Sequence, residues 1–340
     1  MNDLNNIINN LRELTSIDSP SGYTNKVVDY VEERIKKTNL KCFRTNKGNL
    51  IVEAGKGDKV LGFACHIDTL GLMVRSINCD GTLKFTKIGG PQLNTLDGEY
   101  CRIITRDNKI YTGTILSNSP AAHVFADAKE LKRDVDNMHV RLDEIVTCKE
   151  DVTKLGINAG DIIAYDPKTT ITESGFIKSR FLDDKMSAAI LLQIIDDIAS
   201  RNIVLNNKVY FIFSTYEEVG HGCGWVPSDL QELISVDMGC VGLDMNCTEQ
   251  QVSICAKDSS GPYDYNITSN LINLAKENNI PYAVDIYPFY SSDVSAALRG
   301  GSDIRGGLIG PAIAASHGME RTHIKSVVSA FLLVKAYINK

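Results

Sequence analysis

The pattern of apolar and polar positions is clearest at 209–213, where the chain carries an unbroken apolar run. Such runs are typical of strands buried on both faces of a mainly parallel sheet. Two adjacent carboxylates, Glu217 and Glu218, follow this run, and glycines come directly after them. Because ligands of open α/β sheets bind just beyond the carboxyl ends of strands, the pattern predicts a functional site here. A solvated strand end with an acidic turn is the alternative interpretation of these two glutamates alone.

Two more apolar runs end in residues that can bind metal ions. The run at 61–65 leads into His66 and Asp68, and the run at 233–236 leads into Asp237. A histidine in a strand is often a buried core residue, but a nearby carboxylate suits an imidazole whose second nitrogen is held in place. Asp244, seven residues after Asp237, is a second candidate acid.

A third pair of acids stands at the start of a predicted helix. A short extended segment at 176–181 precedes Asp183 and Asp184, and the helical pattern then runs to about Ile198. An acid at a helix N-terminus caps free N–H groups, and this structural role suits Asp184. Asp183 lies at the junction of strand and helix and is the better candidate for a site.

Between residues 73 and 172 the pattern changes to short alternating segments separated by turn signals, which is typical of a small β-barrel or sandwich. The segment 127–143 is charged and only loosely helical in pattern. Because the α/β pattern resumes at Phe176, we expect an inserted domain at 73–172 that serves oligomerisation or acts as a lid. The catalytic domain would then be discontinuous, at 1–72 and 173–340. His123 and His139, both in the insertion, are interpreted as non-ligands, and a role for His123 at the substrate cleft is the alternative.

Composition narrows the class of protein. A net charge of −6 over 340 residues argues against nucleic acid or an anionic membrane as the main partner. The nine cysteines show no Cys-x-x-Cys spacing, which favours reduced thiols over disulfides or a thiolate metal site. The N-terminal residues lack the features of a signal peptide, and no stretch approaches a membrane span. We therefore expect a soluble cytoplasmic protein.

The candidate residues form a coherent set of metal ligands. His66, Asp183, Glu218, Asp237 and a histidine near the C-terminus supply two imidazoles and three carboxylates. This set of nitrogen and oxygen donors suits two zinc, cobalt or manganese ions that share a bridging carboxylate. Glu217 remains as the general base for a water molecule.

In this order, the motifs resemble the tetrahedral (TET) and glutamyl aminopeptidases, which are dinuclear metallopeptidases with zinc or cobalt. The resemblance covers nearly the whole chain. It implies an α/β fold, with a three-layer zinc-aminopeptidase-like catalytic domain on a central mixed sheet and an inserted small β-barrel. The matching motifs are His66-Ile-Asp68, Leu182-Asp183-Asp184-Lys185, Glu217-Glu218-Val-Gly220, Val236-Asp237, Ser292-Asp293 and Arg321-Thr-His323.

The resemblance also implies metal-binding roles. His66 and Asp237 would bind one metal, and Glu218 and the C-terminal histidine the other. Asp183 would bridge the two. His323 is preferred as that histidine because an arginine precedes it by two and an apolar helix follows it directly. His317 is the alternative.

Further roles concern protons and substrate. The resemblance implies that Asp68 orients His66 and that Glu217 carries a proton from water to the leaving amine. Asp237 is preferred to Asp244 as the metal ligand because it directly ends an apolar strand. We expect Asp293, or the acidic loop 258–264, to hold the free α-amine of the substrate.

The sequence thus predicts an aminopeptidase that removes N-terminal residues from peptides. By resemblance it would form homo-oligomers, from a dimer to a dodecameric shell. One alternative is a related dinuclear amidohydrolase that acts on acylated amino acids or blocked peptides. The other is a catalytically inactive protein that binds peptides or serves in assembly.

Overall fold

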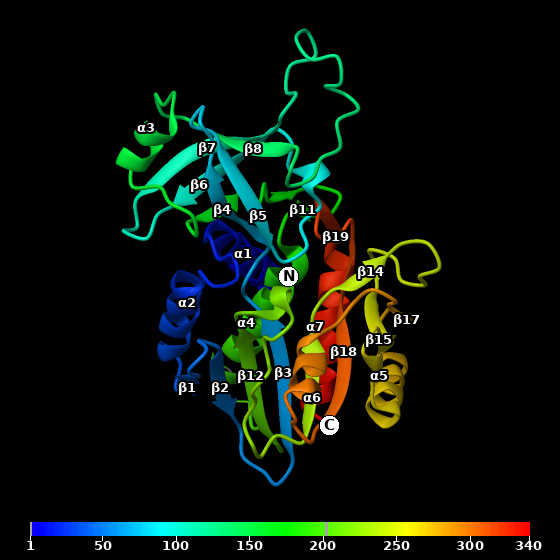
Figure 1. Ribbon diagram of the computed structural model, residues 1–340. Coiled ribbons are helices and arrows are strands. Elements are labelled where there is room, and N and C mark those ends of the chain that lie inside the picture. Colours follow the sequence, from blue (N-terminus) through cyan, green and yellow to red (C-terminus); the bar gives the residue numbers. More distant parts are fainter. Residues whose placement is uncertain (1, 201–202) are drawn as a thin grey trace. The chain divides into compact units, whose positions relative to one another are not determined.

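The computed structural model describes residues 2–200 and 203–340, and the chain divides into two compact units (Figure 1). One comprises Met1–Asp68 and Lys168–Lys340, and we call it the α/β unit. The other, Thr69–Pro167, is the barrel unit. The sequence pattern placed these junctions after residues 72 and 172, where the change of pattern becomes visible, a few residues beyond the observed ones.

The α/β unit is built on a mixed sheet of 13 strands. Its main path runs in the order β1 (Lys41–Arg44), β2 (Leu50–Ala54), β12 (Lys208–Ser214), β3 (Val60–His66), β13 (Glu232–Val236), β18 (Arg305–Ala314), β19 (Glu320–His323), β11 (Phe176–Ser179) and β10 (Thr170–Ile171). Further strands extend from β18, namely β14 (Gly239–Val241), β15 (Val252–Asp258), β16 (Gly261–Pro262) and β17 (Tyr282–Ile286).

The centre of this sheet is parallel, and its register gathers the strand ends. Strands β12, β3, β13 and the first half of β18 run in the same direction. Ser214 pairs with His66, and Ser235 pairs with Ala64, so Asp237 is level with His66. The acids and the imidazole that follow these strands therefore emerge at one edge of the sheet.

Helices cover both faces of the sheet. The larger core lies under α1 (Asn2–Ser16), α2 (Asn25–Lys36), α4 (Leu182–Ser200), α5 (Tyr265–Glu277) and α7 (Ile324–Ile338). A second core lies under α6 (Asp293–Arg299) and the segment after β12. Successive residues of β12 alternate between the two cores, which explains its unbroken apolar run. The predicted three-layer α/β class is confirmed.

The barrel unit is a closed antiparallel barrel, as predicted for an inserted β domain. Its strands follow the order β4 (Gly71–Ile77), β5 (Leu83–Ile88), β8 (Met138–Leu142), β7 (Ile110–Ser117), β6 (Glu99–Ile104) and β9 (Ile162–Tyr165). A short helix, α3 (Lys149–Lys154), precedes β9. The loosely helical interpretation of 127–143 is wrong: the segment forms turns and then β8. There, buried Val140 and Leu142 alternate with exposed Arg141, a period of two.

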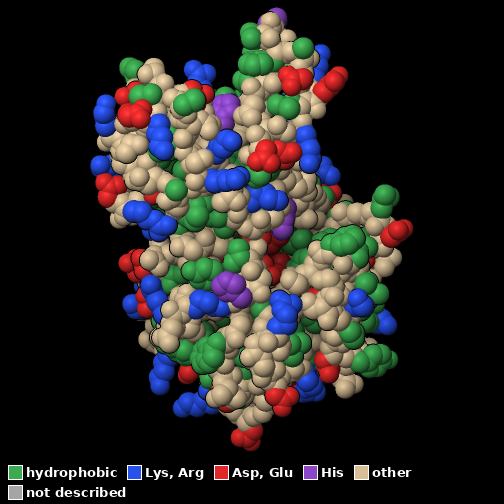
Figure 2. Space-filling view, viewed as in Figure 1, with side chains coloured by type: hydrophobic (Ala, Val, Ile, Leu, Met, Phe, Trp, Pro, Cys, Tyr) green, Lys and Arg blue, Asp and Glu red, His purple; other side chains and the backbone are tan. Residues whose placement is uncertain are grey.

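The surface and the thiols agree with the compositional analysis. Figure 2 shows basic and acidic side chains interspersed over the viewed face. All nine cysteines are free. Within the described ranges, no helix has the length and apolarity needed to span a membrane.

Gly310 allows β18 to pass close to Asp237, the residue that follows β13. A Cβ atom at Gly310 would lie 1.3 Å from the carbonyl oxygen of Asp237, whose amide donates to Ile309. We expect Gly310→Ala to lower the free energy of unfolding by about 3 kcal/mol, the upper end of ordinary overpacking costs. Gly242→Ala is the control, because nothing lies within 4 Å of the added Cβ. This substitution should change the free energy of unfolding by less than about 0.5 kcal/mol. Urea denaturation measures both, and equal midpoints would contradict the close approach.

Candidate metal centre and active site

A cavity of about 230 Å³ lies at the edge of the sheet where the parallel strands end. Carboxylates dominate its wall; Asp183 and Asp237 are buried, and the other lining residues are partly or fully exposed. The lining residues are Asp183, Glu217, Glu218, Gly220, Asp237, Phe289, Tyr290, Ser291 and His317. Three of the acids follow strands whose register brings their ends together, and the fourth begins α4.

His66 ends β3 and turns one ring nitrogen toward these acids. Its Nε2 lies 3.0 Å from Asp183 Oδ1 and 3.8 Å from Glu217 Oε2. Its Nδ1 lies 3.0 Å from the backbone carbonyl oxygen of Asp68 and 3.6 Å from a carboxylate oxygen of the same residue. With Nδ1–H hydrogen-bonded to that carbonyl, loss of the proton from Nε2 would direct its lone pair at the cluster, which is the state a metal ligand requires.

The carboxylate of Asp68 has a different contact from the one expected. Oδ1 accepts a hydrogen bond from the backbone N–H of Glu217 at 3.2 Å, and Oδ2 accepts from the Ser21 hydroxyl. Asp68 therefore holds the imidazole through its backbone and the glutamate-bearing loop through its side chain. A sequence pattern cannot show this, because an acid two residues after His66 is expected whether its carboxylate contacts the imidazole or the loop.

Two buried side chains clamp the loop that carries Glu217 and Glu218. The Asn49 side chain accepts a hydrogen bond from the Thr215 N–H at 3.2 Å and donates one to the carbonyl oxygen of Gly222 at 2.9 Å. Asp293 accepts from the Cys223 N–H at 2.7 Å and from the Ser214 hydroxyl. Both oxygens of Asp293 thus bind the loop, and Asp293 does not line the cavity, although the sequence suggested an amine-binding role.

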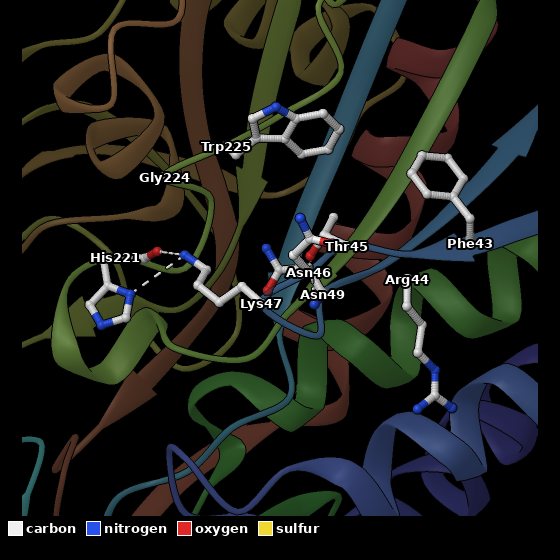
Figure 3. A pocket seen from close by; sticks show the side chains of 9 residues that line it. All are labelled: Phe43, Arg44, Thr45, Asn46, Lys47, Asn49, His221, Gly224 and Trp225. Carbon is white, nitrogen blue, oxygen red and sulfur yellow. Dashed lines mark hydrogen bonds between the residues drawn. The ribbon is translucent and has the colours of Figure 1, made fainter.

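A separate cavity of about 530 Å³ lies beside the same loop (Figure 3). Phe43 and Trp225 stand at it, and the Lys47 ammonium donates to the carbonyl of His221. Its lining includes no carboxylate and shares no residue with the acidic cavity. We therefore assign to its wall the holding of the loop and not the chemistry.

The structure brings His317 into the cluster and leaves His323 outside it. His317 Nε2 lies 3.5 Å from Asp183 Oδ2 and 3.6 Å from Glu218 Oε2. His323 precedes α7, where its Nδ1 accepts from the Lys325 N–H and its Nε2 lies 3.0 Å from the carbonyl of Ser174. The helix that begins after His323, which favoured this residue in the sequence, gives it the role of a helix cap.

Glu320 is a site residue that sequence reasoning missed. Its two carboxylate oxygens accept hydrogen bonds from the backbone N–H groups of Asp183, at 3.1 Å, and of His317, at 3.0 Å. The residue is buried on β19, and it ties together two segments that lie 134 residues apart (317 − 183) in the chain. The only sign in the sequence was an acid three residues after a histidine.

The remaining acids differ in burial. Asp237 is buried, and its carboxylate can approach ligand atoms of His66 and Asp184 within 4.8 Å. Asp184 is also buried and accepts from the His66 N–H at 3.2 Å, so it is part of the cluster and not a surface cap. Asp244 is exposed on a turn, with a φ of 62°.

So many buried acids repel one another when ionised. Burial, with help from neighbouring carboxylates and against the effect of His66, raises the pKa of Glu217 and Glu218 well above the usual value. The same causes raise the pKa of Asp237 to about 7. For Asp183, hydrogen bonds from His317 and His66 overcome burial and lower the pKa below its usual range.

The donor set fits divalent cations. Within the described part of the chain, the buried atoms Glu218 Oε1 and Asp184 Oδ1 have no hydrogen-bond partner. Buried polar atoms are nearly always paired, so unpaired carboxylate oxygens in an acidic cluster indicate a missing positive charge. Imidazole nitrogen and carboxylate oxygen are the donors that zinc and related ions accept.

Comparison with known proteins identifies the class. The M42 glutamyl aminopeptidase family profile matches residues 48–333. YhfE of Bacillus subtilis is 45% identical over 331 residues, covering 96% of each chain. An aminopeptidase of Desulfurococcus kamchatkensis has a TM-score of 0.87 at 23% identity, covering 99% of this chain and 95% of its own. The TET1 peptidase of Pyrococcus horikoshii has a TM-score of 0.86 at 22% identity, and the match covers 98% of this chain and 99% of its own.

Fold and site together define a peptide hydrolase of the aminopeptidase class. The chain belongs to the M42 glutamyl aminopeptidase family. The resemblance noted in the sequence motifs is thereby confirmed.

Asp293 offers a test of loop positioning against amine binding. Asp293→Asn keeps one acceptor oxygen and loses the other, so the loop should shift. We expect kcat to fall about tenfold, which corresponds to a rise of about 1.4 kcal/mol in the activation free energy. KM for short peptides should stay within about twofold, because the cavity wall is intact. Steady-state kinetics on a peptide series measures both constants.

Asp285→Asn is the matched control. Asp285 is buried and likewise accepts from a backbone N–H, that of Asn246, and a serine hydroxyl, that of Ser253, but it does not touch the loop. The Asp285→Asn substitution should leave kcat unchanged. A rise of KM at constant kcat in Asp293→Asn would favour the amine-binding role instead.

Proposed function

We propose that this chain removes single N-terminal residues from peptides at a dinuclear site of divalent cations. The observation that carries the proposal is the cluster of buried acids and two imidazoles around one cavity, with unpaired carboxylate oxygens. The proposed ligands are His66, Asp183, Glu218, Asp237 and His317.

The geometry of Asp183 supports its bridging role. Oδ1 faces His66 at 3.0 Å, and Oδ2 faces His317 at 3.5 Å. We assign His66 with Asp237 to one cation and His317 with Glu218 to the other. His317 thus replaces His323, which the sequence favoured. Zinc suits this set best, and cobalt or manganese would also fit.

Glu217 is the proposed acid–base residue. When bound, the cations would lower the pKa of a water molecule and polarise the substrate carbonyl. Glu217 lines the cavity, and burial raises the pKa of its carboxyl, which makes the carboxylate a better proton acceptor. It would take the proton of the attacking water and give it to the leaving amine. The Asp68 carboxylate would hold the Glu217 backbone during both transfers.

Assembly into homo-oligomers, from a dimer to a dodecamer, is also proposed. The Pyrococcus horikoshii TET1 peptidase can assemble into a tetrahedron or a large octahedral shell. The barrel unit exposes large side chains, among them Tyr100 and Ile110, which suit an assembly surface. A shell of this kind would admit peptides and exclude folded proteins. Free cysteines throughout support a cytoplasmic location.

The acid–base role is tested by Glu217→Gln. Loss of a positioned proton carrier costs typically 10²–10⁴-fold, so we expect kcat for a peptide or aminoacyl p-nitroanilide to fall at least about 100-fold. Bound metal should be retained, because Glu217 is not among the proposed ligands. Glu249→Gln, which changes an acid paired with Arg321 outside the cavity, is the control.

The same assay separates substrate classes. Free and N-acylated peptides should be compared after chelation and reloading with zinc, cobalt or manganese. Cleavage of acylated peptides alone would contradict the aminopeptidase activity, and activity independent of metal would contradict the dinuclear site.

The choice of histidine is tested by comparing His317→Ala with His323→Ala. Loss of residues that only orient a ligand weakens metal binding 10–100-fold, so losing the ligand itself should weaken one site at least about 100-fold. His323→Ala should keep both ions and lose about 1 kcal/mol of stability through its helix cap. Chelator competition and thermal unfolding measure the two effects. Full metal affinity in His317→Ala would contradict the assignment.

A further inference from the structure

We propose that Tyr290 is a further catalytic residue, whose phenol donates a hydrogen bond to the substrate carbonyl oxygen as that oxygen becomes an oxyanion. The proposal rests on the peptide hydrolysis proposed above. It concerns a residue that lies on the connection between β17 and α6, outside every motif that suggested the metal centre.

The hydroxyl of Tyr290 is unusual among the tyrosines of the core. Tyr290 lines the acidic cavity, yet its hydroxyl oxygen is buried and finds no geometrically regular hydrogen-bond partner among the described residues. Tyr263 pairs with Asp258, Tyr287 with Ser253 and Tyr337 with Glu232. Tyr23 also has an unpaired hydroxyl, but it lines neither the acidic cavity nor the one in Figure 3. A buried, unpaired hydroxyl at a reaction cavity is available to a substrate.

The ring is held firmly enough to present this hydroxyl. Its centroid lies 5.3 Å from that of Tyr287. Its backbone carbonyl accepts from both the N–H and the hydroxyl of Ser259, at 3.0 and 2.6 Å. A donor fixed in advance costs little reorganisation when charge develops, and this is the condition under which such donors accelerate acyl transfer.

The rest of the wall lacks a comparable donor. The acids Asp183, Glu217, Glu218 and Asp237 accept hydrogen bonds when ionised, and the imidazole of His317 is a proposed metal ligand. Apart from the partly exposed Ser291, the phenol is therefore the neutral side-chain O–H group among the residues that line the cavity.

The reaction balances without proton transfer from Tyr290. The water oxygen forms a bond to the carbonyl carbon, and the π electron pair moves to the carbonyl oxygen, where the phenol hydrogen bond strengthens. Glu217 holds the proton released by water. When the C–N bond breaks, the electron pair returns to re-form the carbonyl, and the proton moves to the leaving nitrogen. Tyr290 keeps its own proton throughout.

A competing role is purely structural. The phenol lies near the Asp237 carboxylate, and a hydrogen bond from it opposes the rise that burial causes in the pKa of that acid. If this contact only fixed a proposed metal ligand, Tyr290 would be a positioning residue. The two roles differ in what loss of the hydroxyl would change. If Tyr290 binds the oxyanion, affinity for the transition state falls; if it positions Asp237, affinity for the metal falls.

The experiment compares Tyr290→Phe with wild type and with Tyr287→Phe, using the full chain reloaded with zinc. Tyr287→Phe removes a paired hydroxyl from the same segment and should leave the kinetics unchanged. Kinetics on a short peptide are combined with the affinity for a phosphinic peptide analogue, which mimics the tetrahedral anion, and for the free amino acid product. Metal content and thermal unfolding are measured on the same samples.

For Tyr290→Phe we expect kcat to fall about 100-fold and analogue affinity to fall in parallel, as when one oxyanion donor is removed. KM, product affinity, metal content and stability should stay unchanged. Unaltered kcat and analogue affinity would overturn the proposal, and so would a loss of zinc that accounts for the loss of activity. A wild-type protein that cleaves no peptide would instead refute the proposed function itself.

Discussion

The burial of several carboxylates at one edge of a parallel sheet is the constraint on which the rest of the site depends. Removed from water, Glu217, Glu218 and Asp237 resist ionisation, and their pKa values rise. Two imidazoles offset part of this cost, and two carboxylate oxygens still lack partners. Once ionised, such acids need further positive charge beside them, which is why we propose a metal centre here and not a structural ion-pair network.

The scaffold holds this unfavourable cluster with buried polar side chains that do not take part in the chemistry. Asn49 and Asp293 fix the loop after β12, while Asp68 links that loop to the imidazole at the end of β3. Glu320 fixes the backbones of Asp183 and His317. These contacts involve backbone N–H groups, so they position the ligands while leaving their side chains directed at the cavity. Tyr290, by contrast, lines the cavity itself, and its hydroxyl is the group to which we assign a role toward the substrate.

The fold class and much of the site followed from local patterns. Unbroken apolar runs predicted parallel strands, and a run that ends in an acid or a histidine predicted where His66, Glu218 and Asp237 would meet. The change to short alternating segments predicted the inserted barrel. Each of these inferences depends on periodicity and on strand direction, which neighbouring residues in the chain already specify.

The sequence by itself therefore determined the class of fold, the edge of the sheet where the site lies and most of its acids. Tertiary structure decided what depends on long-range contacts. His317 and not His323 reaches the cluster, because His323 caps α7 while Glu320 holds the turn at His317. Asp293 binds a loop, and the Tyr290 hydroxyl has no geometrically regular hydrogen-bond partner in the part of the chain that the structure describes. Several of these choices depend on residues far apart in the chain, such as Asp293 and Cys223 at 70 residues or Glu320 and Asp183 at 137, and no local pattern of polarity encodes which of them will meet.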